Sequence, residues 1–137
     1  MREVSAAYPH HIFFASLPSH SRSDSLSLSL FYTADCTKNA PVGVANRVNL
    51  GLIPDSSMAW EAAVRSLGPA GGWLHVHTNC GSEEVDETAE SMRERVEELA
   101  VQSGRCGAIV DVRHIERVKS YAPRVLHIVV DLWVRTP

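Results

Sequence analysis

Two histidines of this 137-residue chain, His75 and His77, are separated by one residue in the segment Trp73-Leu-His-Val-His-Thr78. Alternate residues of a β-strand point to the same face, so both imidazoles could reach one ligand or one metal ion. A metal ion would need further ligands, and the sequence around this pair contains no HExxH motif and no pair of cysteines. We therefore expect a structural or substrate-facing histidine pair and no metal site.

A second group of polar residues follows the ends of apolar runs. Asn49, Pro54 and Asp55 lie at the end of the run 47–53, and Asn79 follows the next run. In open α/β sheets, ligands bind outside the carboxyl ends of the strands. A side-chain amide beside a carbonyl near proline could hold a planar heterocycle or the polar end of an amino acid. The same residues would also suit a plain strand-to-helix turn with an N-cap, and both interpretations stay open on the residues alone.

Other catalytic motifs are missing from the sequence. No GxSxG element supports a Ser/His/Asp triad. The glycine-rich stretch Gly68-Pro-Ala-Gly-Gly72 lies between an expected helix and an expected strand, whereas dinucleotide and S-adenosylmethionine loops follow a strand and precede a helix. That stretch is therefore expected to be a turn. The cysteines Cys36, Cys80 and Cys106 form no CxxC pair, which suits a reducing compartment and predicts no disulfide-linked partner.

The elements that would position these residues become regular from residue 46 onward. Apolar spacing predicts strands at Arg47–Ile53, Trp73–Thr78, Cys106–Val112 and Val125–Val134, and helices at Met58–Leu67 and Glu83–Gln102. In the longer helix the apolar residues are spaced 4, 3, 4 and 3 apart and share one face: Val85, Ala89, Met92, Val96 and Leu99. A basic segment is expected to join the last two strands.

The element order β-α-β-α-β-β predicts an α/β fold with a mostly parallel sheet and a final antiparallel pair. Residues 1–45 differ from the rest, with seven serines between Ser16 and Ser29 and a Ser-Leu alternation over Ser25–Leu30. Serine offers little apolar surface to bury. We expect residues 1–45 to form a poorly ordered segment or a marginal strand outside the main core, and residues 46–137 to form the folded domain.

The composition is that of an ordinary globular protein, with 45% hydrophobic and 21% charged residues, and it suits one domain. The net charge of −3 gives no overall basic field for nucleic acid. No apolar run approaches the roughly 20 residues of a membrane helix, so a soluble intracellular protein is expected. Eight of the 16 acidic residues lie between Glu83 and Glu98, where a solvated helix face is expected.

Three blocks of the sequence resemble the tRNA wybutosine-synthesizing protein 2 family, in order and in spacing. They are Asn46-Arg-Val-Asn-Leu-Gly-Leu-Ile-Pro-Asp-Ser56 with Trp60 after it, Gly71-Gly-Trp-Leu-His-Val-His-Thr-Asn79, and Glu116-Arg-Val-Lys-Ser-Tyr-Ala-Pro-Arg124 with His127-Ile-Val-Val-Asp-Leu132. Together they span about residues 46–137 and look like the C-terminal half of that family's proteins. Residues 1–45 match no block of the family.

This resemblance implies the C-terminal half of a class I, Rossmann-like, S-adenosylmethionine-dependent methyltransferase sheet. It also implies transfer of the 3-amino-3-carboxypropyl group from S-adenosylmethionine to C7 of the modified guanosine at position 37 of tRNA(Phe), in the cytoplasm. The RNA partner would be the anticodon stem-loop. Residues implied to face cofactor or substrate are Asn49 and Pro54, as the family's Asn-x-x-Pro element, with Asp55, His75, His77 and Asn79 beside them. Arg117, Lys119 and Arg124 would contact the tRNA backbone.

One feature of the family is missing from residues 1–45: the Asp-x-x-x-Gly-x-Gly cofactor loop with its acidic ribose ligand. We therefore expect a truncated product of such a gene that binds S-adenosylmethionine negligibly and leaves the outer edge of the strand 47–53 unpaired. Two alternatives remain, a tRNA guanosine-37 N1-methyltransferase and a non-catalytic fragment that acts as an interaction protein. The long Asn-Leu-Gly-Leu-Ile-Pro block and the Leu-His-Val-His strand favour the aminocarboxypropyl transferase.

Overall fold

A computed structural model describes residues 13–16, 29–32 and 40–137 of the chain. Its elements are β1 (Phe13–Ser16), β2 (Ser29–Tyr32), β3 (Arg47–Leu50), the 3-10 turn η1 (Ser57–Ala59), α2 (Trp60–Ser66), β4 (Gly71–Gly81), α3 (Val85–Gln102), β5 (Ile109–Ala122) and β6 (Val125–Arg135). From β3 onward the order is the predicted β-α-β-α-β-β. Most of residues 1–45, including most of the Ser-Leu alternation, lies outside the described residues.

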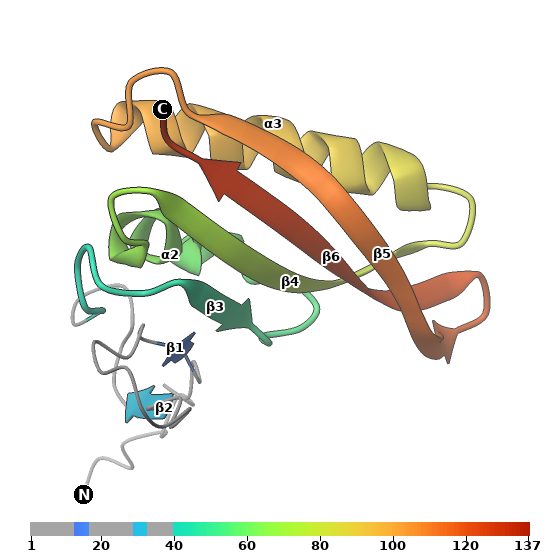
Figure 1. Ribbon diagram of the computed structural model, residues 1–137. Helices are drawn as coiled ribbons and strands as arrows, with labels where there is room; N and C mark the ends of the chain where they lie inside the picture. The colour runs from blue at the N-terminus through green and yellow to red at the C-terminus, as the bar shows by residue number, and fades with distance from the viewer. Residues whose placement is uncertain (1–12, 17–28, 33–39) are drawn as a thin grey trace, which may run out of the picture.

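The described strands form one mixed sheet in the order β2-β1-β3-β4-β6-β5 (Figure 1). β3 and β4 are parallel, while β6 runs antiparallel to both β4 and β5. The predicted antiparallel pair at the end of the chain is therefore confirmed. The prediction of a mostly parallel sheet is wrong for these strands, because β6 inserts between β4 and β5 and keeps two strands of the same direction apart.

The outer edge of β3 carries a partner strand. β1 pairs with β3 in antiparallel register, with Phe13 opposite Leu50 and Ser16 opposite Arg47, and β2 pairs with β1 in turn. The expected unpaired edge is therefore wrong, since the backbone groups along β3 face strands on both sides. Two short pieces of the serine-rich N-terminal region thus extend the sheet.

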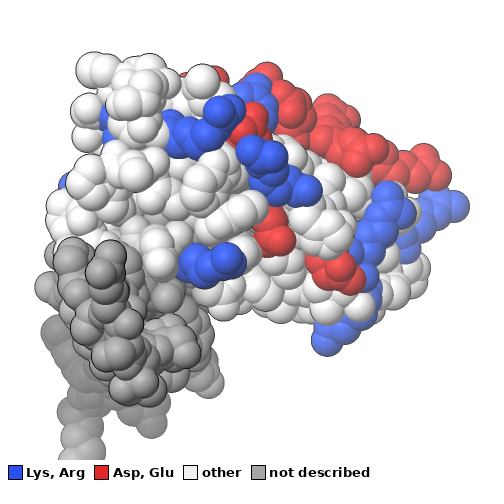
Figure 2. Space-filling view, in the orientation of Figure 1, with Lys and Arg blue, Asp and Glu red and all other residues white. Residues whose placement is uncertain are grey.

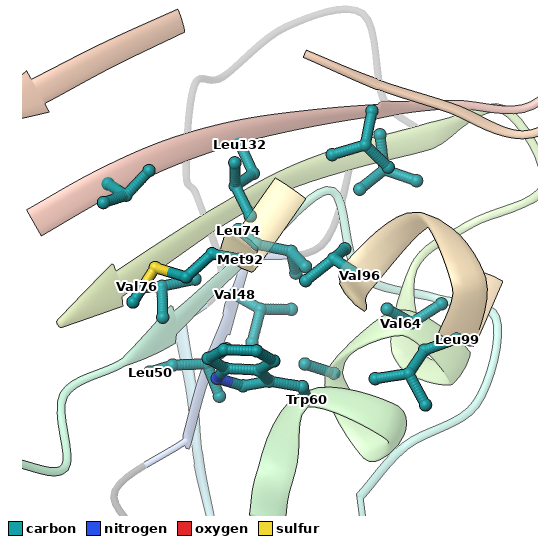
Figure 3. Packing of buried hydrophobic residues seen from close by; sticks show 14 of the residues in the cluster. Val48, Leu50, Trp60, Val64, Leu74, Val76, Met92, Val96, Leu99 and Leu132 are labelled. Atoms are coloured by element: carbon teal, nitrogen blue, oxygen red, sulfur yellow. The ribbon is translucent and has the colours of Figure 1, made fainter. Parts of the chain in front are cut away.

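Both helices pack on one face of the sheet and bury a single apolar core (Figure 3). All five residues of the predicted apolar face of α3 are buried. They meet alternate residues of three strands, which include Val48, Leu50, Leu74, Val76, Ile128, Val130, Leu132 and Val134. The acidic side chains of α3 form a ridge on the outside (Figure 2), as expected for a solvated face. Within the described residues, no helix is long and apolar enough to cross a membrane.

The first helix starts differently from the prediction. Ser57–Ala59 forms a 3-10 turn, and α2 begins only at Trp60. Because three residues complete a turn there, the apolar stripe rotates relative to an α-helix. Met58, which was predicted to belong to the stripe, is 57% exposed, and Trp60 is buried in the core at 8% exposure.

The basic segment that was expected to join the last two strands is itself strand. β5 continues to Ala122 and stays paired with β6 to Val125, with register shifts near Val112, Arg117 and Ser120. Most side chains from Arg113 to Ala122 are exposed, so hydrogen bonds to β6 and not apolar burial hold this part of the strand. The result is a two-stranded ribbon that extends past the helices (Figure 1).

The glycine-rich stretch before β4 is a tight turn, as predicted. Gly71 has a φ of +99°, and a Cβ atom at this position would collide with the carbonyl group of Val134 on β6. Only glycine tolerates both the backbone angle and the close approach. The turn therefore sets the start of β4 and, through it, the position of the histidines that follow.

Candidate functional site

The sheet face opposite the helices carries most of the polar residues that the sequence singles out. Because side chains alternate along a strand, burial of Val48 and Leu74 against the helices directs Asn49 and His75 to the other face. His77 and Asn79 follow on the same face of β4. Since β3 and β4 are parallel, their carboxyl ends meet at one edge of the sheet, where ligands bind in open α/β sheets.

Four of these side chains form a continuous hydrogen-bonded chain across three strands. His77 Nε2 lies 3.2 Å from Asn49 Oδ1 on β3. On its other side, His77 Nδ1 lies 3.2 Å from Nε2 of His127 on β6. His127 Nδ1 lies 3.1 Å from Oδ1 of Asn79, which brings the chain back to β4. We call these four residues the Asn-His-His-Asn chain.

The loop after β3 is held against the end of β4 through Pro54. The Ile53–Pro54 peptide bond is cis. The Pro54 carbonyl oxygen accepts hydrogen bonds from the Thr78 hydroxyl at 3.0 Å and from the Asn79 backbone N–H at 3.3 Å. Pro54 therefore fixes the loop beside the Asn-His-His-Asn chain through its carbonyl group.

Asp55 is occupied by its own turn. Its two carboxylate oxygens accept hydrogen bonds from the Ser57 backbone N–H at 2.9 Å and from the Ser57 hydroxyl at 2.8 Å. Asp55 is exposed, and within the described residues no side-chain contact links it to the chain of four. These contacts form an Asx turn before η1, while the N-caps of η1 and α2 are Ser56 and Ala59, neither of which makes a side-chain cap hydrogen bond.

His75 forms a separate group one step further from the strand ends. Its Nδ1 lies 2.6 Å from Asp131 Oδ1 on β6, and its Nε2 lies 3.4 Å from Arg47 Nη1 on β3. Because arginine can only donate, Nε2 is the accepting nitrogen and Nδ1–H donates to the carboxylate. Trp73 stacks parallel to the His75 ring with 6.3 Å between centroids, which fixes the ring further. His75 thus links the Arg47 guanidinium on β3 to the Asp131 carboxylate on β6.

The electrostatic environment lowers the pKa of His77. The largest cause is burial, followed by the proximity of the imidazoles of His127 and His75, while Asp131 acts in the opposite direction. This environment disfavours a full positive charge on the His77 ring alone.

The structure brings together three of the six side chains predicted to face a ligand: Asn49, His77 and Asn79. Pro54 adjoins them through its carbonyl group, whereas His75 and Asp55 are bound to other partners. Sequence reasoning missed His127 and Asp131 as members of these groups. Both lie on β6, and only the register of β6 against β4, which pairs His127 with Asn79 and Asp131 with His75, would have revealed them.

The three basic residues predicted to contact RNA lie on the β5–β6 ribbon. Arg117 and Lys119 lie on β5, and Arg124 occupies the connecting turn with a φ of +60°. All three are exposed, and no carboxylate of the described residues lies within ion-pair distance of them. In Figure 2, lysine and arginine side chains gather on the right, toward the tip of this ribbon and next to the end of the acidic ridge.

The described residues fit one side of a cofactor site and no metal site. No group of three metal-binding side chains occurs in the part of the chain that the structure describes. The strand-end amides, together with the loop at Pro54, offer polar contacts for the edge of a heterocycle. The turn from β3 to η1 has a single glycine, Gly51, and therefore no glycine-rich phosphate-type cradle.

Known proteins resemble this chain in sequence. Over 96 residues, which are 70% of this chain, it is 45% identical to the Arabidopsis thaliana protein named tRNA wybutosine-synthesizing protein 2/3/4. It is 32% identical over 119 residues to the Danio rerio homologue of tRNA wybutosine-synthesizing protein 2, covering 65% of this chain. These matches span only 10% and 29% of the respective relatives. No family model matches the chain.

Solved structures show the same fold. M. jannaschii TYW2 in complex with AdoMet superposes with a TM-score of 0.64 at 24% identity, over 76% of this chain and 44% of that one. Trm5b from Pyrococcus abyssi superposes with a TM-score of 0.59 at 23% identity, over 74% of this chain and 28% of that one. Together with the sequence matches, these similarities assign the fold to the C-terminal half of a class I S-adenosylmethionine-dependent methyltransferase sheet. The chain belongs to the tRNA wybutosine-synthesizing protein 2 family and corresponds to the C-terminal part of its methyltransferase-like domain.

Proposed function

We propose that this chain contributes one half of the active site of a tRNA aminocarboxypropyl transferase in wybutosine biosynthesis. The complete enzyme moves the 3-amino-3-carboxypropyl group of S-adenosylmethionine to C7 of the modified guanosine at position 37 of tRNA(Phe). The protein acts in the cytoplasm, where its RNA partner is the anticodon stem-loop.

The observation that carries this proposal is the position of Asn49. It lies one residue before the end of β3 and is hydrogen-bonded to His77 on the neighbouring parallel strand, and the loop that follows β3 is tied to Asn79 by Pro54. This is the edge at which open α/β sheets bind ligands. Asn49, Pro54, His77 and Asn79 all belong to the blocks that resemble the family. The name of the Arabidopsis relative supports the same pathway.

In this function the residues of the strand ends orient and bind, and the cofactor supplies the electrophilic carbon when it is bound. The carboxamides of Asn49 and Asn79 provide hydrogen-bond donors and acceptors for the edge of a planar base. His77 holds the Asn49 carboxamide through Nε2. The two hydrogen bonds to the Pro54 carbonyl hold the loop against the end of β4.

The β5–β6 ribbon provides the proposed contact surface for tRNA. Arg117, Lys119 and Arg124 present three exposed cations on one projecting element, and guanidinium and ammonium groups bind phosphate oxygens without reading sequence. The chain as a whole is acidic, so binding of RNA depends on this local charge and not on a global field.

A segment exchange tests the function. Residues 46–137 replace the matching segment of the Arabidopsis relative, and the exchanged enzyme is supplied with S-adenosylmethionine and tRNA(Phe) that carries the precursor base. Mass spectrometry of the modified nucleoside is expected to detect the mass of an aminocarboxypropyl group. Addition of a methyl group would instead identify a guanosine-37 methyltransferase, and a folded exchange enzyme that yields neither product would favour the non-catalytic interaction protein.

A further inference from the structure

In the Asn-His-His-Asn chain, a hydrogen-bond acceptor lies at both ends. Each end of the chain is a carboxamide oxygen, Asn49 Oδ1 at one end and Asn79 Oδ1 at the other, and an amide oxygen can only accept. His77 must therefore donate from Nε2, and His127 must donate from Nδ1. The two remaining ring nitrogens, His77 Nδ1 and His127 Nε2, face each other at 3.2 Å.

With both amide oxygens facing the rings, all of these contacts are satisfied at one proton count. A single proton then lies between the facing nitrogens, because two lone pairs at that distance repel and two protons would clash. The four ring nitrogens then hold three protons, and the pair carries one positive charge. When the pair loses that charge, two protons remain for three hydrogen bonds. Every bond can then be kept only if one end carboxamide turns over and donates from its Nδ2–H.

We propose that His77 and His127 act as a one-proton unit whose protonation state sets the orientation of the carboxamides of Asn49 and Asn79. With the proton bound, both oxygens face the histidines and both NH2 groups face away. Without it, one of the two amides turns and presents its oxygen instead. His127 is thus a positioning residue for the strand ends, and this functional consequence depends on the function proposed above.

Burial makes this unit sensitive to its proton count. His127 is 7% exposed, so an unpaired ring nitrogen there would lack water to satisfy it. Protonation of both rings would place two charges about one hydrogen bond apart in a partly buried site, which the same burial opposes. The two histidines should therefore take up one proton as a pair and resist the second.

The charged groups around the unit come from each neighbouring strand. On the same face, β3 contributes Arg47, β4 contributes His75 and β6 contributes Asp131, and His75 is hydrogen-bonded to each of the other two. β5 places Lys119 opposite His127 in the register. β1 (residues 13–16) contains no titratable side chain. The Arg47 guanidinium and the Asp131 carboxylate lie on opposite sides of His75 and largely offset each other. Burial and the proximity of the His127 ring therefore remain the two largest influences on His77.

Nuclear magnetic resonance tests this proposal on the 137-residue chain itself. Long-range 15N–1H spectra report the proton occupancy of each ring nitrogen from about pH 8 to about pH 5, the range in which histidines titrate. We expect the rings of His77 and His127 to shift together and to take up one proton between them. At high pH, both should carry the same tautomer. Independent titration curves, two full imidazolium rings in the folded chain, or opposite tautomers at high pH would overturn the proposal.

Two variants sharpen the test. Asn79→Asp replaces the amide with an acceptor that cannot turn to donate, so His127 should be locked with its proton on Nδ1 and the pair should bind its proton at a pH about 1–3 units higher. His127→Gln should remove the coupling, so that His77 takes up its proton alone. The control is His114→Gln on β5, an exposed histidine whose only side-chain partner among the described residues is Glu116. It should leave both rings unchanged.

The result is separable from the proposed function. If the titrations of His77 and His127 are not coupled, the one-proton unit is refuted. The exchange enzyme could still make its product in that case. An exchange enzyme that makes no aminocarboxypropyl product would refute the proposed function, whereas the titration of His77 and His127 would still be measured on the unaltered chain.

Discussion

A buried hydrogen bond behind the candidate site offers a sharp test of how the loop after β3 is held. The indole Nε1–H of Trp60 donates to the Ser56 hydroxyl at 3.0 Å. Ser56 is 1% exposed and Trp60 8% exposed, so neither group can exchange its partner for bulk water. The bond joins the end of the Pro54 loop to the first turn of α2 and thereby to the core.

The expected cost of breaking this bond follows from its burial. Trp60→Phe keeps an aromatic ring in the core but leaves the Ser56 hydroxyl without its donor, at about 1–3 kcal/mol, and the smaller ring adds about 1 kcal/mol of lost apolar burial. Ser56→Ala leaves the indole N–H without an acceptor, again at about 1–3 kcal/mol. In the double variant neither group is left unpaired. Its free energy of unfolding should therefore fall by less than the sum of the two single losses, by about 1 kcal/mol.

Urea denaturation followed by far-ultraviolet circular dichroism measures the four free energies of this cycle. Ser57→Ala is the matched control, because it removes a neighbouring hydroxyl that lies on the surface and should change stability by less than about 0.5 kcal/mol. Losses that add to within about 0.3 kcal/mol would refute the coupling of Ser56 and Trp60 and the role assigned to this bond.

Four further predictions concern the site and its surroundings. In the exchange enzyme, Asn49→Ala should lower turnover by about 10- to 100-fold, equivalent to about 1–3 kcal/mol, with an unchanged melting temperature; steady-state kinetics and calorimetric melting measure the two. Replacing Arg117, Lys119 and Arg124 with glutamine should weaken tRNA binding and flatten its dependence on salt, and an equal salt slope in filter-binding assays would exclude phosphate contacts. The folded-state pKa of His77 lies below its unfolded value of 6.5. The contribution of His77 to stability should therefore be complete above about pH 6.5 and decline as the pH falls through the folded-state pKa. Urea midpoints measured against pH, with His77→Gln as the reference variant, test this dependence. Finally, titration calorimetry of the 137-residue chain should detect no micromolar binding of S-adenosylmethionine, because the first 42 residues contain no glycine from which to build the family's cofactor loop.

Much of the architecture could be predicted because its signal is local. The buried face of α3 follows from apolar residues at helical spacing, and the structure buries all five of them. The paired helices and strands from β3 to β4 follow from apolar runs that turns interrupt. In these elements the local secondary-structure preference agrees with the tertiary packing, so the apolar pattern alone was enough to predict them.

The errors arose where a long-range pairing outweighs the local pattern. β5 from Arg113 to Ala122 is rich in charged residues and carries no strand-like apolar stripe, yet hydrogen bonds to β6 make it a strand. The parallel order of the sheet was misjudged for the same reason. The local sequence of β6 does not indicate that this strand pairs with both β4 and β5 and lies between them.

The candidate site combines both kinds of information. Alternation along β4 correctly places His75 and His77 on one face, but it suggests that the two rings share a role, and the structure separates them. The register of β6 sets Asp131 opposite His75 and His127 opposite Asn79, so neighbouring histidines acquire partners of opposite chemistry. One becomes a link between charges, and the other becomes half of a histidine pair with an amide at each end. The chemistry available to the strand ends is therefore decided by a strand about 50 residues away in the sequence, which follows α3 and β5 in the chain and lies between β4 and β5 in the sheet.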